Sequence, residues 1–339
     1  MSGLGVQFLC ISVRQETQGE DTMQNSTPHP AVLLLGFGEM TSVKYLYCSL
    51  ILIGYSVIIL LNSAVIAVTV LHETLQRPMY IFISAFCING LYGSTAFFPS
   101  VFINLFKEAQ TISYGACILQ DFAVNTYGGS EMTLLAVMAF DRYVSICHPL
   151  RYNSIMSLPT VFRLIGAAWL YPFILVSILV LLTVRLPLCD WVILKIYCDN
   201  WSVVRLSCVD TSTNNAYGIL CTVAILVVMP ILIVISYIAI LRVCAKSSKD
   251  FQAKALQTCA PHLLAIATYL VDVLFEIFLY RYSPTSLPPA LRVFMSIHFL
   301  VVPPLLNPLI YGLKIRELRV KINKLLQKQS IPLREPKHP

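Results

Sequence analysis

The sequence predicts an all-α membrane protein: a seven-transmembrane helix bundle with a short amphipathic eighth helix on the cytoplasmic surface. Of its 339 residues, 57% are hydrophobic and only 12% are charged, whereas soluble domains carry roughly 25% charged residues. Long apolar runs recur along the chain, and the basic residues behind its net charge of +7 lie between these runs. This placement is typical of loops beside anionic headgroups, so we expect membrane lipid and no nucleic acid as a partner.

Five spans follow directly from stretches that contain no Asp, Glu, Lys or Arg, because a charge at the bilayer centre is strongly unfavourable. The stretches hold 28, 29, 21, 31 and 21 residues, and a spanning helix needs about 20. They lie between Lys44 and Glu73, Arg77 and Lys107, Arg163 and Arg185, Asp210 and Arg242, and Arg292 and Lys314.

Two further spans are interrupted by carboxylates. We predict both as transmembrane because their apolar stretches are long and an acidic side chain is tolerated where it faces the bundle interior. They are residues 109–141, which include Asp121 and Glu131, and residues 255–280, which include Asp272 and Glu276.

The basic residues orient the bundle. With the N-terminus outside, 16 of the 24 Lys and Arg residues face the cytoplasm and 8 face the other side, as the positive-inside rule requires. Residues 6–13 are too short an apolar run for a cleavable signal, and Met23 is an alternative start. We therefore expect an extracellular tail over residues 1–43, a seven-span domain over 44–312, and a cytoplasmic amphipathic helix and tail over 313–339.

Four of the 11 cysteines fall on the outer side, an oxidising compartment. Four cysteines allow three pairings, and spacing alone does not choose among them. We expect Cys117–Cys198, which would tether the loop between spans four and five to span three, and Cys189–Cys208 within that loop. The remaining cysteines are interpreted as small packing residues.

Two glycosylation sequons, at Asn25 and Asn200, also fall on the outer side. The first lies in the free tail, and we expect it to carry a glycan. The second lies two residues from Cys198, so it is glycosylated only if the nearby bridge leaves it accessible.

Span three ends in residues 138–147, MAFDRYVSIC. Arg142 keeps its charge and offers five donors, and Asp141 beside it can hold the guanidinium in place. Taken alone, an arginine at a helix end could equally extend to the lipid headgroups. Three further segments favour a functional role for Arg142 over the headgroup alternative. They are residues 71–80 (LHETLQRPMY), 254–263 (KALQTCAPHL) and 304–311 (PLLNPLIY).

These four segments, with their order and spacing, resemble the odorant receptors of the rhodopsin-like G protein-coupled family. The resemblance covers roughly residues 40–327. It implies a receptor, not an enzyme, that binds a small odorant and activates a stimulatory, olfactory-type heterotrimeric G protein, without a cofactor, in the plasma membrane of olfactory cilia. Its activation residues would be Asp141, Arg142, Tyr143, Asn307, Pro308 and Tyr311.

Span two departs from the family pattern. It reads Asn89-Gly90 where the family usually has an acid, a form that resembles the fish-type branch. The change removes one ligand of a cation site and leaves Glu131 in span three as a possible ion site. No other metal site is expected.

Prolines mark joints in the bundle because they remove a backbone donor and kink a helix. Pro230, Pro261 and Pro308 lie in spans five, six and seven, and Asn62 and Asn307 could bond the freed backbone groups. Such joints allow two packings that a ligand biases through differential affinity. We expect ligand binding to move the inner ends of spans five and six away from Arg142.

The ligand is expected among the outer halves of spans three, five, six and seven. Asp121, Asn125 and Gly128 share a face of span three, and Asp272 and Glu276 lie one turn apart on span six. The two acids on span six could bind a cationic ligand such as an amine. Alternatively, Asp121 reaches outer water and the pair on span six is neutralised structurally by Arg281, Arg292 or Tyr280.

Residues 313–327 predict a membrane-surface helix, since apolar residues recur on one face and basic residues fill the rest. The apolar face consists of Ile315, Leu318, Ile322, Leu325 and Leu326.

Rival classes fit less well. A retinal protein needs a mid-span lysine in span seven, and Lys314 lies beyond that span. Neither the paired repeats of a transporter nor the acidic rings of a channel are recognisable, and no nucleophile–base pair or phosphate loop suggests an enzyme. The nearest alternative is a rhodopsin-like receptor for another small amine or a peptide, against which the segments at 138–147 and 254–263 argue.

Overall fold

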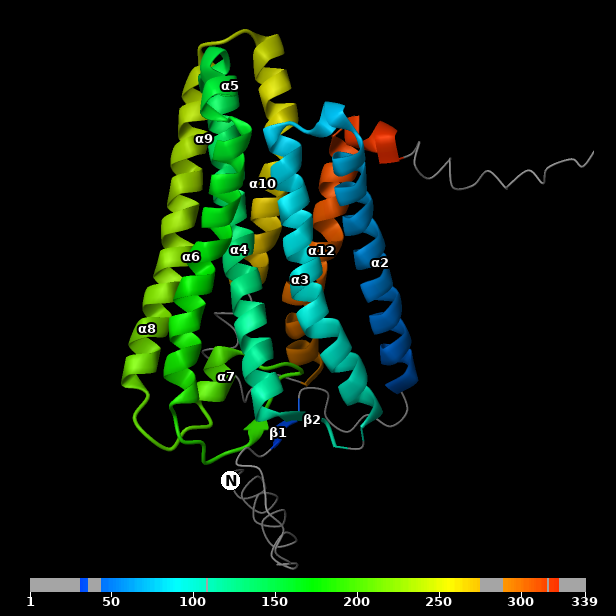
Figure 1. Ribbon diagram of the computed structural model, residues 1–339, viewed down its shortest axis with the longest axis vertical. Coiled ribbons are helices and arrows are strands. Elements are labelled where there is room, and N and C mark those ends of the chain that lie inside the picture. The colour runs from blue at the N-terminus through cyan, green and yellow to red at the C-terminus, as the bar shows by residue number, and fades with distance from the viewer. Residues whose placement is uncertain (1–30, 36–43, 108, 275–288, 316, 323–339) are drawn as a thin grey trace, which may run out of the picture. The chain divides into compact units, whose positions relative to one another are not determined.

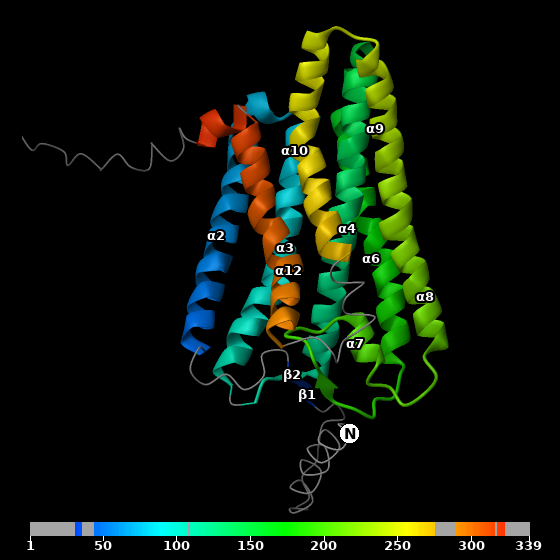
Figure 2. The same ribbon diagram turned by 180° about the vertical axis from the view of Figure 1, so that it is seen from behind.

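The computed structural model describes residues 31–35, 44–107, 109–274, 289–315 and 317–322, which belong to one compact unit beginning at Ala31. Within these residues, seven long helical stretches pack side by side as a bundle, as the sequence predicts (Figures 1 and 2). They are α2 (Lys44–Leu71), α3 (Pro78–Phe106), α4 (Tyr114–Cys147), α6 (Leu158–Val184), α8 (Ser212–Val223) with η3 (Ala224–Val228) and α9 (Met229–Ala245), α10 (Lys249–Leu274) and α12 (Pro289–Lys314).

Among the described helices, four are long and apolar enough to cross a membrane by length and composition alone: α2, α3, α6 and the continuous stretch Ser212–Ala245. α4 falls outside that set because it carries polar side chains inward. Asp121, Glu131, Asp141 and Arg142 on α4 are all buried, and α4 contacts α3, α6, α9 and α10. It is the central helix, and its charges face protein rather than lipid.

Span five contains a joint near Pro230, where the sequence predicts one. α8 passes through a wider π-helical turn at Ala224–Val228 before α9 begins at Met229. A proline lacks the amide hydrogen, and its ring clashes with the carbonyl four residues earlier, which here is Leu226 inside that turn. The π turn accommodates both effects without ending the helix.

The outer end carries a small three-stranded sheet that the sequence analysis did not predict. β1 (Ala31–Leu34) lies between β2 (Thr111–Ser113), to which it is antiparallel, and β3 (Val192–Ile193), to which it is parallel. Strands of two to four residues are too short to show a period-two pattern. Val32 and Leu34 are buried against the loops that carry the other two strands.

Short helices occupy the loops, and the tail begins with a helix. η1 (Glu73–Leu75), η2 (Pro149–Arg151) and α5 (Tyr152–Ile155) lie at the inner end, and α7 (Asn200–Val204) lies in the outer loop between α6 and α8. Residues 317–322 are helical. Leu318 is fully buried, and Ile315 and Ile322 pack against the same core, so the predicted apolar face packs on the bundle. Leu325, Leu326, Asn25 and Glu276 lie outside the described residues.

Candidate ligand pocket and activation site

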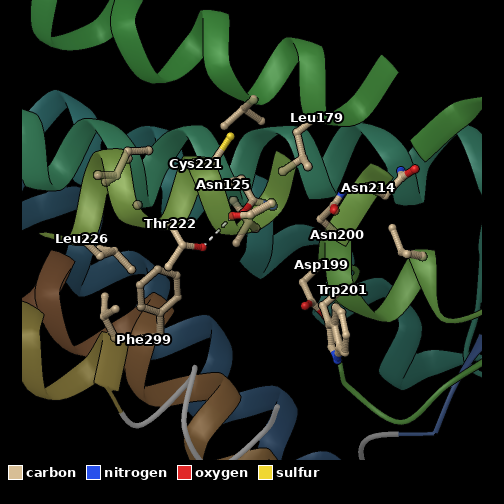
Figure 3. Close-up of a pocket in the computed structure, with 18 of the residues that line it drawn as sticks. Asn125, Leu179, Asp199, Asn200, Trp201, Asn214, Cys221, Thr222, Leu226 and Phe299 are labelled. Atoms are coloured by element: carbon tan, nitrogen blue, oxygen red, sulfur yellow. Dashed lines mark hydrogen bonds between the residues drawn. The ribbon is translucent and has the colours of Figure 1, made fainter. Parts of the chain in front are cut away.

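A cavity of about 250 Å³ lies in the outer half of the bundle, lined by α4, α8, α10 and α12 (Figure 3). These helices are the spans where the sequence predicts the ligand. Two further elements line it that the sequence did not indicate, α6 and the loop helix α7. Of the predicted ligand residues that the structure describes, Asn125 and Gly128 line the cavity, whereas Asp121 and Asp272 do not.

The cavity has a polar end and an apolar end. Asn200 and Asn214 lie at one end near Asp199, whereas Leu226 and Phe299 lie together at the other (Figure 3). The shape therefore suits a small molecule with a polar group at one end and a hydrocarbon part at the other.

Asp121 lies directly behind the polar end and is fully buried, so it does not reach outer water. Asn125 Nδ2 donates to Asp121 Oδ1 at 2.6 Å, and Asn200 Nδ2 donates to Asp121 Oδ2 at 3.1 Å. The carboxylate thus orients two amides, Asn125 and Asn200, that line the cavity.

The structure does not fit a glycan on Asn200. A glycan would be attached to Asn200 Nδ2, but this nitrogen also donates to Thr183 Oγ1 at 2.8 Å, inside the bundle. Asn200 is half-buried and lines the cavity. We assign it to the pocket, which the sequence analysis missed because the sequon pattern says nothing about burial.

The outer bridge explains how a loop residue enters the pocket. Cys117 at the start of α4 is joined to Cys198, with Cα atoms 5.3 Å apart, and Cys198 N donates to Gln120 Oε1 at 2.9 Å. Asp199 and Asn200 follow immediately, so the bridge draws them over α4. A second bridge joins Cys189 to Cys208 within the loop. The expected pairings are those in the structure.

The same loop contributes an ion pair that sequence reasoning did not identify. Lys195 is buried. Its Nζ lies 3.4 Å from Asp199 Oδ1 and 5.2 Å from the centre of the Tyr197 ring. All three residues line the cavity. Their position next to Cys198 was the available signal, because a bridge from this loop to span three must fold it over the bundle.

Asp272 on α10 contacts His298 Nδ1 on α12 instead of facing the cavity. Its neighbours Tyr269 and Val273 do line the cavity. Asp272 therefore does not line the cavity, contrary to the expectation that it binds the ligand. Its partner inside the bundle is His298. The other candidate partners, Arg281, Arg292 and Tyr280, have side chains outside the described residues.

Tyr269 connects the cavity to the helix backbone. Its hydroxyl donates to the carbonyl oxygen of Gly128 on α4 at 2.7 Å. A Cβ at Gly128 would lie 3.0 Å from Phe299 Cζ, so this glycine lets the α12 ring approach α4. Tyr269, Gly128 and Phe299 thus form one contact between three helices at the pocket wall.

Below the pocket, Glu131 lies at the centre of a polar cluster. Asn89 Nδ2 donates to Glu131 Oε2 at 2.7 Å, and Asn307 Nδ2 donates to Glu131 Oε1 at 2.8 Å. Asn62 Nδ2 donates to the Pro304 carbonyl at 2.9 Å, as expected, but Asn307 bonds a carboxylate and not the backbone. The described residues contain no group of three or more His, Cys, Asp or Glu side chains suited to a metal ion.

At the inner end, Arg142 is paired with Asp141 and is only 7% exposed. Tyr152 in the loop donates to Asp141 Oδ1 at 2.8 Å. Burial, and then the adjacent Asp141 carboxylate, raise the pKa of Tyr152 above its ordinary value, so the tyrosine remains a proton donor to Asp141. The guanidinium is held inside the bundle and does not extend to the headgroups.

His262 joins the inner halves of three helices. Its Nδ1 lies 2.7 Å from the hydroxyl of Tyr237 on α9, and its Nε2 lies 3.0 Å from the carbonyl of Leu135 on α4. A small cavity of about 10 Å³ separates His262 from Arg142 and Tyr311. Little free space is therefore left beside Arg142.

The other expected activation residues divide into two groups. Tyr311 and Pro308 are buried on α12, and Tyr311 lines the small cavity beside Arg142. Tyr143 instead forms a 3.0 Å hydrogen bond with His148 in the loop. The structure brings Tyr311 to Arg142 but pairs Tyr143 elsewhere.

A family model described as olfactory receptor matches residues 50–329. Human olfactory receptor 2G6 is 35% identical over 89% of this chain and 95% of its own length, and human olfactory receptor 51E1 is 35% identical over 82% and 86%. The crystal structure of squid rhodopsin superposes with a TM-score of 0.68 at 19% identity, covering 90% of this chain and 92% of that one. The chain therefore has the seven-helix rhodopsin fold.

Proposed function

Because this chain belongs to the olfactory receptor family of rhodopsin-like G protein-coupled receptors, we propose that it binds a small odorant in the outer cavity and activates a stimulatory, olfactory-type G protein. Such a G protein raises cyclic AMP. The observation that carries the proposal is the pair of sites itself: a cavity in the outer half of the bundle and, on the same helix α4, a buried arginine at the inner end.

The proposal extends to topology and branch. The multi-pass chain would place residues 1–43 outside the cell, residues 44–312 in the membrane and residues 313–339 in the cytoplasm, in the plasma membrane of olfactory cilia. Asn89-Gly90 in α3 supports a place in the fish-type branch. Asn25 would carry a glycan on the outer tail.

The path from pocket to inner end runs along α10. Tyr269 lines the cavity and bonds α4, and His262, two turns nearer the cytoplasm on α10, bonds both α4 and α9. A ligand that packs better against a shifted Tyr269 would favour a packing in which α10 rotates about Pro261, between these contacts and the inner end. Only such differential affinity can shift the equilibrium.

Opening would break contacts at the inner end. Moving α9 and α10 outward separates Tyr237 and His262 from α4 and enlarges the 10 Å³ cavity beside Arg142. The guanidinium, with five donors, would then be free to leave Asp141 and bond a G-protein segment. Asp141 would remain engaged by Tyr152.

The eighth helix would rest on the inner membrane surface. Tyr80 donates to Glu317 Oε2 at 2.6 Å, and Leu318 is buried against the bundle. These contacts hold the start of the helix while its basic residues lie beside anionic lipid.

A peptide ligand is less well supported. The cavity is small and is lined by Asp199, Asn200, Trp201 and Val204 of the outer loop. This size suits a molecule with few non-hydrogen atoms.

The proposal is tested by expressing the full chain on the surface of heterologous cells and measuring cyclic AMP against volatile odorants, amines and amino acids. Dose-dependent cyclic AMP in response to at least one small molecule is expected. A correctly inserted, surface-exposed receptor that never couples to a stimulatory G protein across the panel would contradict it.

A further inference from the structure

We propose that the odorant of this receptor is a small primary amine, whose ammonium group binds at the amide oxygens of Asn125, Asn200 and Asn214 and compensates the charge of Asp121. The inference rests on the proposed function, because it assigns a ligand class to the same pocket. It moves the cation-binding position from α10, where the sequence pointed, to α4 and the outer loop.

The described residues at the polar end of the cavity carry more acidic than basic groups. Among the described residues at this end, two carboxylates, Asp121 and Asp199, accompany one cation, Lys195. Lys195 is 3.4 Å from Asp199, whereas the hydrogen bonds to Asp121 come from the neutral amides Asn125 and Asn200. A fully buried carboxylate is strongly unfavourable without a positive charge nearby. Among the described residues, the side-chain partners of Asp121 are neutral amides, so a ligand that brings a positive charge would stabilise its ionised form.

The three amides direct their nitrogens into the protein. An ionised carboxylate only accepts hydrogen bonds, so the nitrogens of Asn125 and Asn200 must face Asp121. Asn214 Nδ2 also points into the protein, toward Thr183 Oγ1 at 3.4 Å. Each of the three residues lines the cavity, and the atom that each offers to a ligand is its carbonyl oxygen.

An ammonium group fits this set of acceptors. An ammonium has three donors and no acceptor, so it can bond several amide oxygens at once and bring a positive charge. A hydroxyl supplies one donor and no charge. A carboxylate would meet acceptor oxygens and the field of Asp121, and it would have to compete with Asp199 for Lys195.

The rest of the cavity defines the remainder of the ligand. Leu226 and Phe299 form its other end (Figure 3), and Ile225 and Val273 also line the cavity. These apolar side chains favour hydrocarbon. The ligand is therefore a primary amine on a short alkyl or aromatic group that fits within about 250 Å³.

The test uses the purified full-length receptor and its melting temperature at pH 7 with pentylamine, pentan-1-ol or pentanoate. These probes share one hydrocarbon chain and differ in the polar group. We expect pentylamine to raise the melting temperature at concentrations at least about tenfold lower than pentan-1-ol, and pentanoate to give no rise. Equal potency of amine and alcohol, or stabilisation by pentanoate, would overturn the inference.

Asp121→Asn removes the charge and keeps the shape of the side chain. We expect the amine's advantage over the alcohol to disappear in this variant, with the response to the alcohol unchanged. Asp210→Asn, at an exposed outer-loop position, is the matched control and should keep the advantage. A persistent advantage in Asp121→Asn would contradict the role of Asp121. If that variant does not fold, the comparison of pentylamine, pentan-1-ol and pentanoate on the wild-type receptor still tests the ligand class.

The outcomes separate this inference from the proposed function. Stabilisation by amine without a cyclic AMP response would support the ligand class and count against signalling. Cyclic AMP responses confined to neutral or anionic odorants would support signalling and overturn the ligand class.

Discussion

The outer and inner ends of the bundle satisfy their buried polar groups in different ways. At the outer end, neutral amides bond Asp121 and also line a cavity of about 250 Å³. At the inner end, Arg142 is paired with its neighbour Asp141, and the cavity beside it measures about 10 Å³. Both ends belong to α4, so one helix carries an open polar site and a closed one.

This difference indicates that the outer end selects the ligand and the inner end controls signalling. A site with room and unused acceptors can select a ligand, whereas a closed, self-paired arginine can be held inactive until neighbouring helices move. Asp141, Arg142, His262 and Tyr311 at the inner site belong to the segments that resemble the family. Several pocket residues, such as Lys195 and Asn200, come from the outer loop. We therefore expect mutations at the inner end to abolish signalling and mutations at the outer end to change its strength or selectivity.

The largest expected effect is that of Arg142→Ala on signalling. Removing the guanidinium removes the group that would meet the G protein, so no cyclic AMP response should remain at normal surface expression. Arg151→Ala, at an exposed loop position on the same side, is the matched control and should respond normally. An intact dose–response curve for Arg142→Ala would mean that the inner end works without this arginine.

The next largest effect concerns stability at the outer end. Cys117→Ser opens a bridge between residues 81 apart in sequence, and Cys189→Ser opens one between residues 19 apart. Loop-closure entropy predicts losses of about 4–5 kcal/mol and about 3 kcal/mol respectively. Thermal unfolding of the purified variants measures both, and equal losses would show that the entropic account does not order them.

Glycine substitutions compare packing inside the bundle with packing at its surface. A Cβ at Gly129 would lie 2.6 Å from Pro172 Cβ, whereas a Cβ at Gly166 meets nothing within 4 Å. Gly129→Ala should destabilise the protein by about 1–3 kcal/mol through overpacking. Gly166→Ala should stabilise it by up to about 1 kcal/mol through helix propensity. Melting temperatures that move in the same direction would contradict this packing of α4 against α6.

The smallest effect tests the connection between the two ends. Tyr269→Phe removes the 2.7 Å hydrogen bond from α10 to the Gly128 carbonyl, a loss of about 1 kcal/mol. If that bond favours the closed packing, basal cyclic AMP should rise by roughly fivefold. Tyr217→Phe removes a 3.2 Å bond between α8 and α6 and should leave basal signalling unchanged. A fall in basal signalling for Tyr269→Phe would reverse the assigned direction.

Much of the fold could be predicted from composition and charge, because lipid permits few arrangements of a chain. The uncharged stretches locate five spans, and Asp121, Glu131 and Asp272 do face protein, as the two acid-containing spans require. The sheet was missed because hydrogen bonds between distant short segments, such as Leu33 with Trp191, leave no periodic trace.

The pocket was predicted only in part, for a physical reason. Helical spacing places Asn125 and Gly128 on one face of span three, but it does not show which acid has an internal partner. Asp272 on α10 contacts His298, which lies on a different helix, α12. The outer loop has no periodicity at all, so only the bridge at Cys198 could have indicated that Asn200 enters the bundle.

The most direct test of the account is a distance between the inner ends of α4 and α10 with and without ligand. Spin labels at Leu150, in η2 just beyond the end of α4, and at Phe251 on α10, both exposed, would be introduced after replacing the part-exposed Cys147 and Cys244. We predict that an odorant that raises cyclic AMP lengthens the distance by several ångströms, and that Arg142→Ala preserves this lengthening while losing the signal. An unchanged distance at saturating agonist would contradict a pocket that acts by opening the inner end.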